Sequence, residues 1–75
     1  MMNMILNGKK IFVEKMEASD LAELGLSEKS LNIYSDSDID IYRHCEQQDR
    51  FFISTGNNLD FETDIRGIED YFKEF

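Results

Sequence analysis

A stripe of large apolar residues at the end of the chain most constrains how it can fold. Its members recur at the period of one helix face, and they are Phe61, Ile65, Ile68, Phe72 and Phe75. Glu62 and Arg66 are spaced as an i, i+4 ion pair, and Glu69 and Lys73 repeat that spacing. Asp60 is a good N-cap residue just before the stripe. We therefore predict a C-terminal amphipathic helix, capped by Asp60, that forms a wall of the core.

An Asn-Gly pair lies between two apolar runs near the start of the chain. Asn7 and Gly8 both tolerate the positive φ that a type I′ turn requires. The flanking segments, residues 2–6 and 10–15, are therefore predicted to pair as antiparallel strands.

A short helix is predicted to follow this hairpin, over residues 20–24. Ser19 is a suitable N-cap, and Asp20 suits the positive end of the helix dipole. Gly25 suits the position just after a helix. The alternative is that residues 28–30 extend this helix as a second turn.

Alternation of apolar and polar residues predicts three further strands, over residues 31–34, 39–45 and 50–55. In the second of these, the alternation buries Cys45 and exposes His44. The element order is then ββ-α-βββ-α. This order predicts one small two-layer α+β domain spanning residues 1–75, in which an antiparallel sheet of about four to five short strands packs against one short and one C-terminal helix.

The charge of the chain is strongly asymmetric. Residues 1–15 carry three lysines and one glutamate, a net of +2, whereas residues 16–75 carry fifteen acidic and five basic residues, a net of −10. A field of this sign attracts cationic partners and repels nucleic acid and anionic membranes. We therefore expect a basic protein partner and no direct binding to nucleic acid or to a membrane.

The sequence predicts no catalytic, cofactor or metal site. Asp36, Asp38 and Asp40 match the opening of a calcium loop, but Ile41 and Gln47 stand where that loop needs Gly and Glu. The single His and single Cys are neighbours, which point to opposite faces of a strand and cannot act together. One cysteine, with no signal peptide and no membrane span, favours a reducing cytoplasm. We expect a non-enzymatic cytoplasmic protein.

A row of acids and tyrosines is the candidate partner-binding surface. Alternate residues of a strand share one face about 6.6 Å apart, a spacing similar to that of successive phosphates. Tyrosine adds area that a partner can desolvate. The candidate residues are Tyr34, Asp36, Asp38, Asp40, Tyr42 and Glu46. The alternative is that the acids only keep a small domain in solution.

These features favour an acidic inhibitor that occupies the cationic surface of a nuclease or another nucleic-acid-binding protein. In size and charge alone, the chain resembles phage anti-defence proteins such as anti-CRISPRs and nucleic-acid mimics. A second hypothesis is a small accessory or antitoxin-like module that binds through an apolar and tyrosine surface. The sequence leaves the partner, the strand order and the oligomeric state open.

Overall fold

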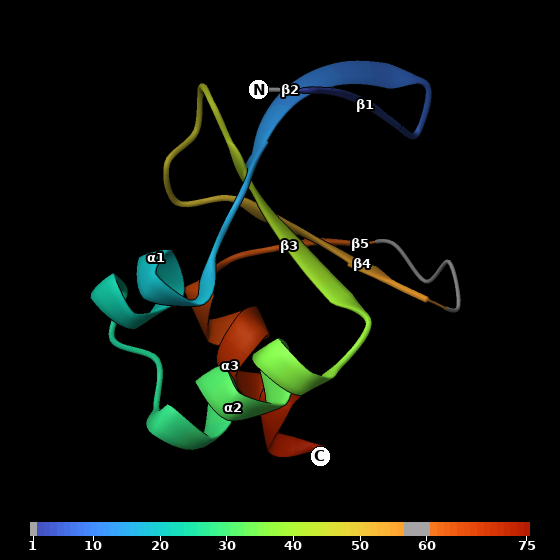
Figure 1. Cartoon of the computed structure of the whole chain (residues 1–75). Coiled ribbons are helices and arrows are strands. Elements are labelled where there is room, and N and C mark those ends of the chain that lie inside the picture. The colour runs from blue at the N-terminus through green and yellow to red at the C-terminus, as the bar shows by residue number, and fades with distance from the viewer. Residues whose placement is uncertain (1, 57–60) are drawn as a thin grey trace.

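In the computed structural model, which describes residues 2–56 and 61–75, five strands and three helices follow one another along the chain. They are β1 (Met2–Leu6), β2 (Lys9–Lys15), α1 (Ala18–Glu23), α2 (Glu28–Asp36), β3 (Ile39–His44), β4 (Phe51–Thr55), β5 (Phe61–Thr63) and α3 (Ile65–Lys73). The strands form one antiparallel sheet in the order β1-β2-β3-β4-β5. The helices lie on one side of this sheet (Figure 1). The predicted two-layer α+β class is therefore confirmed.

The predicted N-terminal hairpin is also confirmed. β1 and β2 pair without interruption from Met2 with Val13 to Leu6 with Lys9. Asn7 and Gly8 have φ values of 53° and 77°, the positive values that a type I′ turn needs. A turn of this hand matches the twist of the strands that it joins, so the local sequence is sufficient to form this unit.

The segment between β2 and β3 differs from the prediction. α1 begins at Ala18, one residue before the predicted cap Ser19, and Asp20 accepts a hydrogen bond from the Glu17 N–H at 2.9 Å. Gly25 does follow the helix end, with a φ of 87°. The strand predicted over residues 31–34 is wrong, because these residues lie within α2, whose N-cap Ser27 accepts a hydrogen bond from the Ser30 N–H at 3.3 Å.

α3 is shorter than the predicted helix. Its N-cap is Asp64, which accepts a hydrogen bond from the Gly67 N–H at 2.9 Å. The predicted cap, Asp60, lies outside the described residues. Phe61 belongs to β5 rather than to the helix. Glu62 is on the same strand, so its predicted helical pair with Arg66 does not form. Lys73 contacts Asp70, at 3.7 Å, instead of Glu69.

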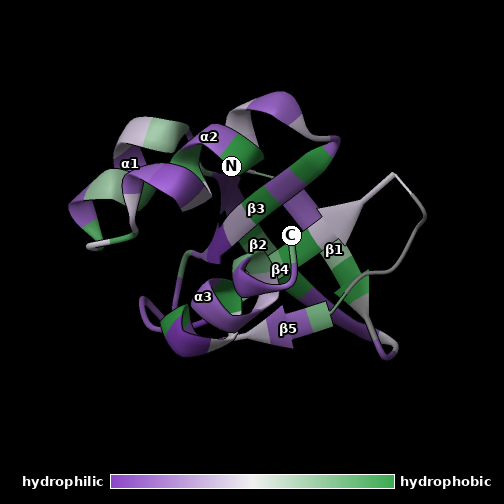
Figure 2. Cartoon of the chain, turned by 90° about the horizontal axis from the view of Figure 1, so that it is seen from below, coloured by the Kyte–Doolittle hydropathy of each residue, from purple (hydrophilic) through white to green (hydrophobic). Residues whose placement is uncertain are grey.

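The core lies between the helices and one face of the sheet. Ile41 is opposite Ile53 in the register, and opposite residues of an antiparallel pair project to the same side. Ile68 and Phe72 of α3 complete this cluster from the helix side, and both are buried. Each helix carries hydrophilic and hydrophobic turns (Figure 2). Within the described residues, no helix has the length and apolar character needed to cross a membrane.

Gly67 lies where α3 approaches β5, and this contact explains a glycine inside a helix. A Cβ at Gly67 would overlap the Thr63 Oγ1 atom and come within 2.8 Å of the Thr63 Cβ. Glycine in a helix costs about 1 kcal/mol relative to alanine. Here that cost is offset by the close packing that the missing side chain permits.

We expect Gly67→Ala to lower the free energy of unfolding by about 1–3 kcal/mol, despite the better helix propensity of alanine. Urea denaturation of the variant and the parent protein measures this change. The matched control is Thr63→Gly combined with Gly67→Ala, in which the overlapping atoms are gone. The interpretation is wrong if Gly67→Ala alone is as stable as the parent.

Tyr34 anchors α2 to the end of β2. Its hydroxyl donates a hydrogen bond to the Met16 carbonyl oxygen, and its ring is buried in the core. This burial raises the pKa of the Tyr34 phenol above its usual value. The folded protein therefore holds the phenolic proton more tightly than the unfolded chain does.

Because folding raises the pKa of Tyr34, the protonated phenol contributes its full stabilisation below the unfolded pKa of about 10. This stabilisation is lost as the pH rises through the pKa of the folded state. We expect Tyr34→Phe to cost about 1 kcal/mol at neutral pH, because it removes a buried hydrogen bond. This deficit should shrink above pH 10. Urea denaturation of both proteins across that range measures it. Lys15, whose pKa is raised chiefly by Asp40, also interacts with Tyr34 and titrates in the same pH range. A constant deficit would contradict the prediction.

Candidate functional site

The six residues proposed for partner binding do not form one surface. Tyr34 was predicted on an exposed strand, but it lies on a helix and is 8% exposed, which is a correction. Asp40 and Tyr42 are on β3, where Asp40 pairs with Lys15 at 3.4 Å and the Tyr42 ring lies 6.4 Å from Phe52.

The other three residues of the set lie in two separate places. Glu46 is in the loop after β3, at the edge of a pocket. Asp36 ends α2, and Asp38 immediately precedes β3, so these two acids lie at a corner of the molecule. Among the described residues, no three potential metal ligands converge, and Asp36 and Asp40 belong to different elements.

This corner joins acidic and aromatic side chains. We define the acidic corner as Asp36, Asp38, Tyr71 and Phe75. Tyr71 is on α3, and Phe75 follows that helix. The corner thus combines the start of β3 with the ends of two helices. The acids were predicted for a partner surface, but their aromatic neighbours are not the predicted tyrosines.

Two open grooves flank Phe75. The first, of about 560 Å³, runs along α2 and is lined by Glu28, Lys29, Asn32, Ile33, Asp36, Ser37 and Phe75. The second, of about 420 Å³, lies between the sheet and α3 and is lined by Ser37, Asp38, Ile39, Thr55, Gly56, Tyr71 and Phe75. Each groove therefore has a carboxylate from one of the two corner acids and shares the ring of Phe75.

The Phe75 ring is exposed but held in place by its neighbours. It is 54% exposed, and its centroid lies 5.4 Å from that of Tyr71 and 6.2 Å from that of Phe72. Edge-on packing of this kind leaves part of an aromatic surface available to a cation. The corner can therefore present a negative charge and an aromatic surface to the same basic side chain.

The surrounding layer strengthens this electrostatic character. Residues 17–36 and 64–75, which contain the three helices, hold nine acidic and three basic residues, a net of −6. Within the described residues, Asp36 and Asp38 make no ion pair, whereas Glu14, Asp40 and Glu62 each face a cation on the sheet. The unpaired negative charge is thus concentrated on the helix side of the molecule.

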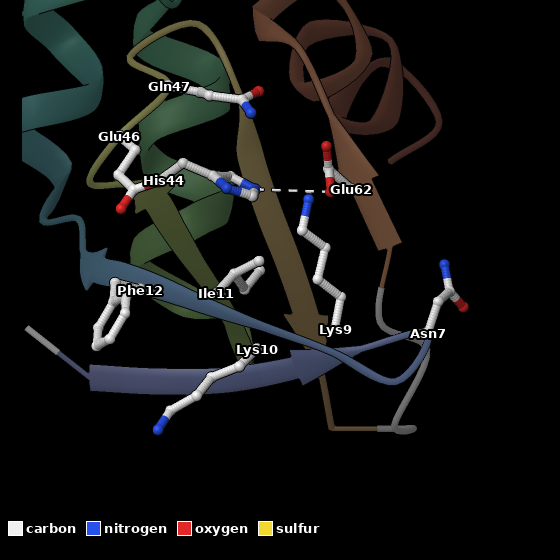
Figure 3. Close-up of a pocket in the computed structure, with 9 residues that line it drawn as sticks. All are labelled: Asn7, Lys9, Lys10, Ile11, Phe12, His44, Glu46, Gln47 and Glu62. Carbon is white, nitrogen blue, oxygen red and sulfur yellow. Dashed lines mark ion pairs between the residues drawn. The ribbon is translucent and has the colours of Figure 1, made fainter.

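A third hollow lies on the opposite face of the sheet. It has a volume of about 360 Å³ and is lined by Asn7, Lys9, Lys10, Ile11, Phe12, His44, Glu46, Gln47 and Glu62. These residues come from the β1–β2 turn, from β2, from the end of β3 and the loop after it, and from β5. Because β2 and β5 are not neighbours in the sheet, the sheet must curl toward this face. Lys9, Ile11, His44 and Glu62 point inward, whereas Lys10 and Phe12 point away (Figure 3).

The curl reverses the predicted exposure of two residues. His44 was predicted to be exposed and Cys45 buried, but His44 is 7% exposed and Cys45 is exposed. His44 pairs with Val13 in the register and lies on the face away from the helices, beneath the curled hairpin. β3 ends at His44, so Cys45 is not covered by the helix layer.

His44 is part of a small polar cluster in this pocket. Its Nε2 atom lies 3.7 Å from Glu62 Oε2 and has no hydrogen-bond partner among the described residues. Arg50 Nε donates a hydrogen bond to Glu62 Oε1 at 3.0 Å. The lining offers an imidazole, carboxylates and amines but no hydroxyl or thiol. This cluster links β3 and β5 with Arg50, the residue just before β4.

The sequence did not identify the main residues of the acidic corner or of the His44 pocket. Phe75 was included in the predicted helical stripe, and Tyr71 was not singled out. Glu62 was predicted to be half of a helical ion pair, and Lys9 was counted in the net charge of residues 1–15. The exposed position of Phe75, beyond the last turn of the helix, was the one available signal. Comparison with known protein families, curated proteins and solved structures finds no match.

Proposed function

We propose that the protein is a non-enzymatic binding protein that occupies the cationic surface of a basic partner. The observation that carries this proposal is the acidic corner, where two carboxylates that make no ion pair with any described residue flank an exposed aromatic ring. The net charge of −6 in the helix layer supports it, because a field of one sign steers a basic partner toward that side.

Two lysine or arginine side chains of the partner would lie in the two grooves beside Phe75. In each groove, the charged group approaches one corner carboxylate while its aliphatic stem covers the aromatic ring. An exposed ion pair contributes about 0.2–1 kcal/mol, and an exposed cation–π contact contributes about 0.5–1 kcal/mol. The contacts are individually weak, so binding depends on several of them acting together.

The partner class follows from the same chemistry. Surfaces rich in lysine and arginine are typical of nucleases and other nucleic-acid-binding proteins. Occupation of such a surface blocks the nucleic acid that it normally binds, which makes the protein an inhibitor and nucleic-acid mimic, as in phage anti-defence systems. The proposed compartment is the cytoplasm, where such partners act.

The alternative is an accessory or antitoxin-like module that binds through apolar and aromatic surface. The exposure of Phe75, together with that of Phe12 on the hairpin, favours it. The two functions differ in their dependence on salt. Charge mimicry weakens steeply as ionic strength rises, whereas an apolar interface changes little.

An NMR titration tests the proposal on the whole chain, with a short Arg/Lys-rich peptide as the probe. We expect amide shifts centred on Asp36, Asp38, Tyr71 and Phe75, and we expect them to diminish in high salt. A peptide of the same length with glutamate in place of the basic residues is the control and should cause no shifts. Shifts spread evenly over all acidic residues, or centred on the His44 pocket, would contradict the proposed surface.

A further inference from the structure

β1 is an open edge of the sheet within the described part of the chain. Its sequence, Met2–Leu6, contains no charged residue and no proline, and its pairing with β2 has no bulge. Ile5 is 76% exposed, and Met2, on the other face of the strand, is also exposed. Proteins usually protect an edge strand with charges, proline, a bulge or a covering element. β1 lacks the first three of these and has unpaired backbone groups along its outer side.

The other edge of the sheet is protected. β5 has only three residues, Phe61–Thr63, and Glu62 places a carboxylate at its centre. α3 follows almost at once and packs against this strand through Gly67 and Thr63. The contrast between the two edges indicates that the exposure of β1 is a specific feature of this sheet.

Charge determines which partner fits this edge. Residues 2–13 contain no carboxylate, and the first fifteen residues carry a net charge of +2 on a chain of −8. The hairpin extends away from the helix layer (Figure 1). Two copies that met through β1 would therefore keep their acidic helix layers apart, whereas contact through the helix layers would bring two negative surfaces together.

We propose that β1 pairs antiparallel with β1 of a second copy, so that the two sheets become continuous. In a hairpin closed by a two-residue loop, Leu6 and Lys9 form the last hydrogen-bonded pair, and such pairs alternate along the strands. Asn3 and Ile5 consequently direct their N–H and C=O groups outward. Pairing centred on Met4 places Asn3 opposite the partner's Ile5 and satisfies these groups in both copies.

The side chains that this register brings together are also compatible with one another. Met4 lies opposite the partner's Met4, and Ile11 is the β2 neighbour of Met4 in each copy. The middle of the joined sheet is then an apolar row of four side chains from the two copies. Ile5 loses its exposed position against the partner's Asn3. A two-fold axis through the Met4 pair makes the contact isologous, so that Asn3 of each copy meets Ile5 of the other.

Sedimentation equilibrium at several salt concentrations tests the dimer. We expect a dissociation constant in the micromolar range, because two paired strands bury less area than a standard interface. The dimer should strengthen as salt screens the repulsion between two acidic chains, the opposite of the trend for a basic partner. Ile5→Lys should abolish it, and Phe75→Ala should leave it intact. A monomer at about 1 mM protein in high salt, or a dimer unaffected by Ile5→Lys, would overturn the proposal.

Disulfide trapping tests the register, in a Cys45→Ser background. The two Met4 Cα atoms would lie about 4.5 Å apart, as in a non-hydrogen-bonded pair, which is close enough for a disulfide. Met4→Cys should therefore form a covalent dimer under mild oxidation. Asn3→Cys is the matched control and should not, because the two Asn3 positions are diagonal neighbours about 8 Å apart. Crosslinking at position 3 but not at position 4 would indicate another register or a parallel pair and would overturn the assignment.

Discussion

Replacing Phe72 with alanine is expected to remove most of the stability of the protein. Phe72 is 2% exposed, and it packs in the core cluster that joins α3 to the sheet. Truncation of a buried phenylalanine costs about 3–5 kcal/mol. A single core in a domain of this size rarely supplies more than about 3–5 kcal/mol in total. The variant should therefore be largely unfolded near room temperature.

Urea or thermal denaturation followed by circular dichroism measures this loss. The matched control is Phe75→Ala, which removes an aromatic ring that is 54% exposed and lies close to Phe72. We expect that control to cost about 1 kcal/mol or less, since little apolar area returns to water. If Phe72→Ala melts within a few degrees of the parent, α3 does not hold the core as described.

The second large effect is expected on partner binding. Asp36→Asn, Asp38→Asn and Phe75→Ala together remove both corner carboxylates and the ring between them. The ion pairs and the cation–π contact that are removed contribute about 1.4 kcal/mol or more to binding in total. We therefore expect the affinity for an Arg/Lys-rich peptide to fall about tenfold. Loss of the charges should mainly slow association, and loss of the ring should mainly speed dissociation.

Titration calorimetry at low salt compares this variant with a control of equal charge. The control is Glu46→Gln with Asp49→Asn, two exposed acids in the loop after β3. Glu46 was one of the residues predicted from the sequence, and the structure places it away from the corner. We expect the control to retain nearly the parental affinity. Equal losses in both variants would show that net charge, and not the corner, determines binding.

Local signals in the sequence determined which parts of the fold were predictable. The Asn7–Gly8 turn specifies its hairpin because its conformation depends on those two residues alone. α2 was missed because alternation over residues 31–34 is too short to distinguish a strand from a helix, although Ser27 offers a cap. The start of α3 was misplaced because Asp60 and Asp64 are both good caps. Because α3 begins after the N-cap Asp64, Phe61 lies outside the helix and pairs in the sheet.

The candidate surfaces were less predictable, because they depend on contacts between distant segments. The acids at positions 36 and 38 were identified correctly as exposed, but no local pattern places Phe75 beside them. The burial of His44 likewise depends on the curl of the sheet, which brings β2 and β5 to one pocket. Period-two alternation assigns residues to two faces, but it does not say which face another part of the chain will cover.

The order of strands in the sheet has a consequence for how the chain folds. Every strand pairs with the next one in sequence, and only the pairing of β2 with β3 spans intervening helices. The other pairings close short loops, which cost little chain entropy and form quickly. Joining Val13 to His44 is therefore expected to be the slow step of folding. Early formation of α1 and α2 would shorten the flexible chain between these two strands and speed that step.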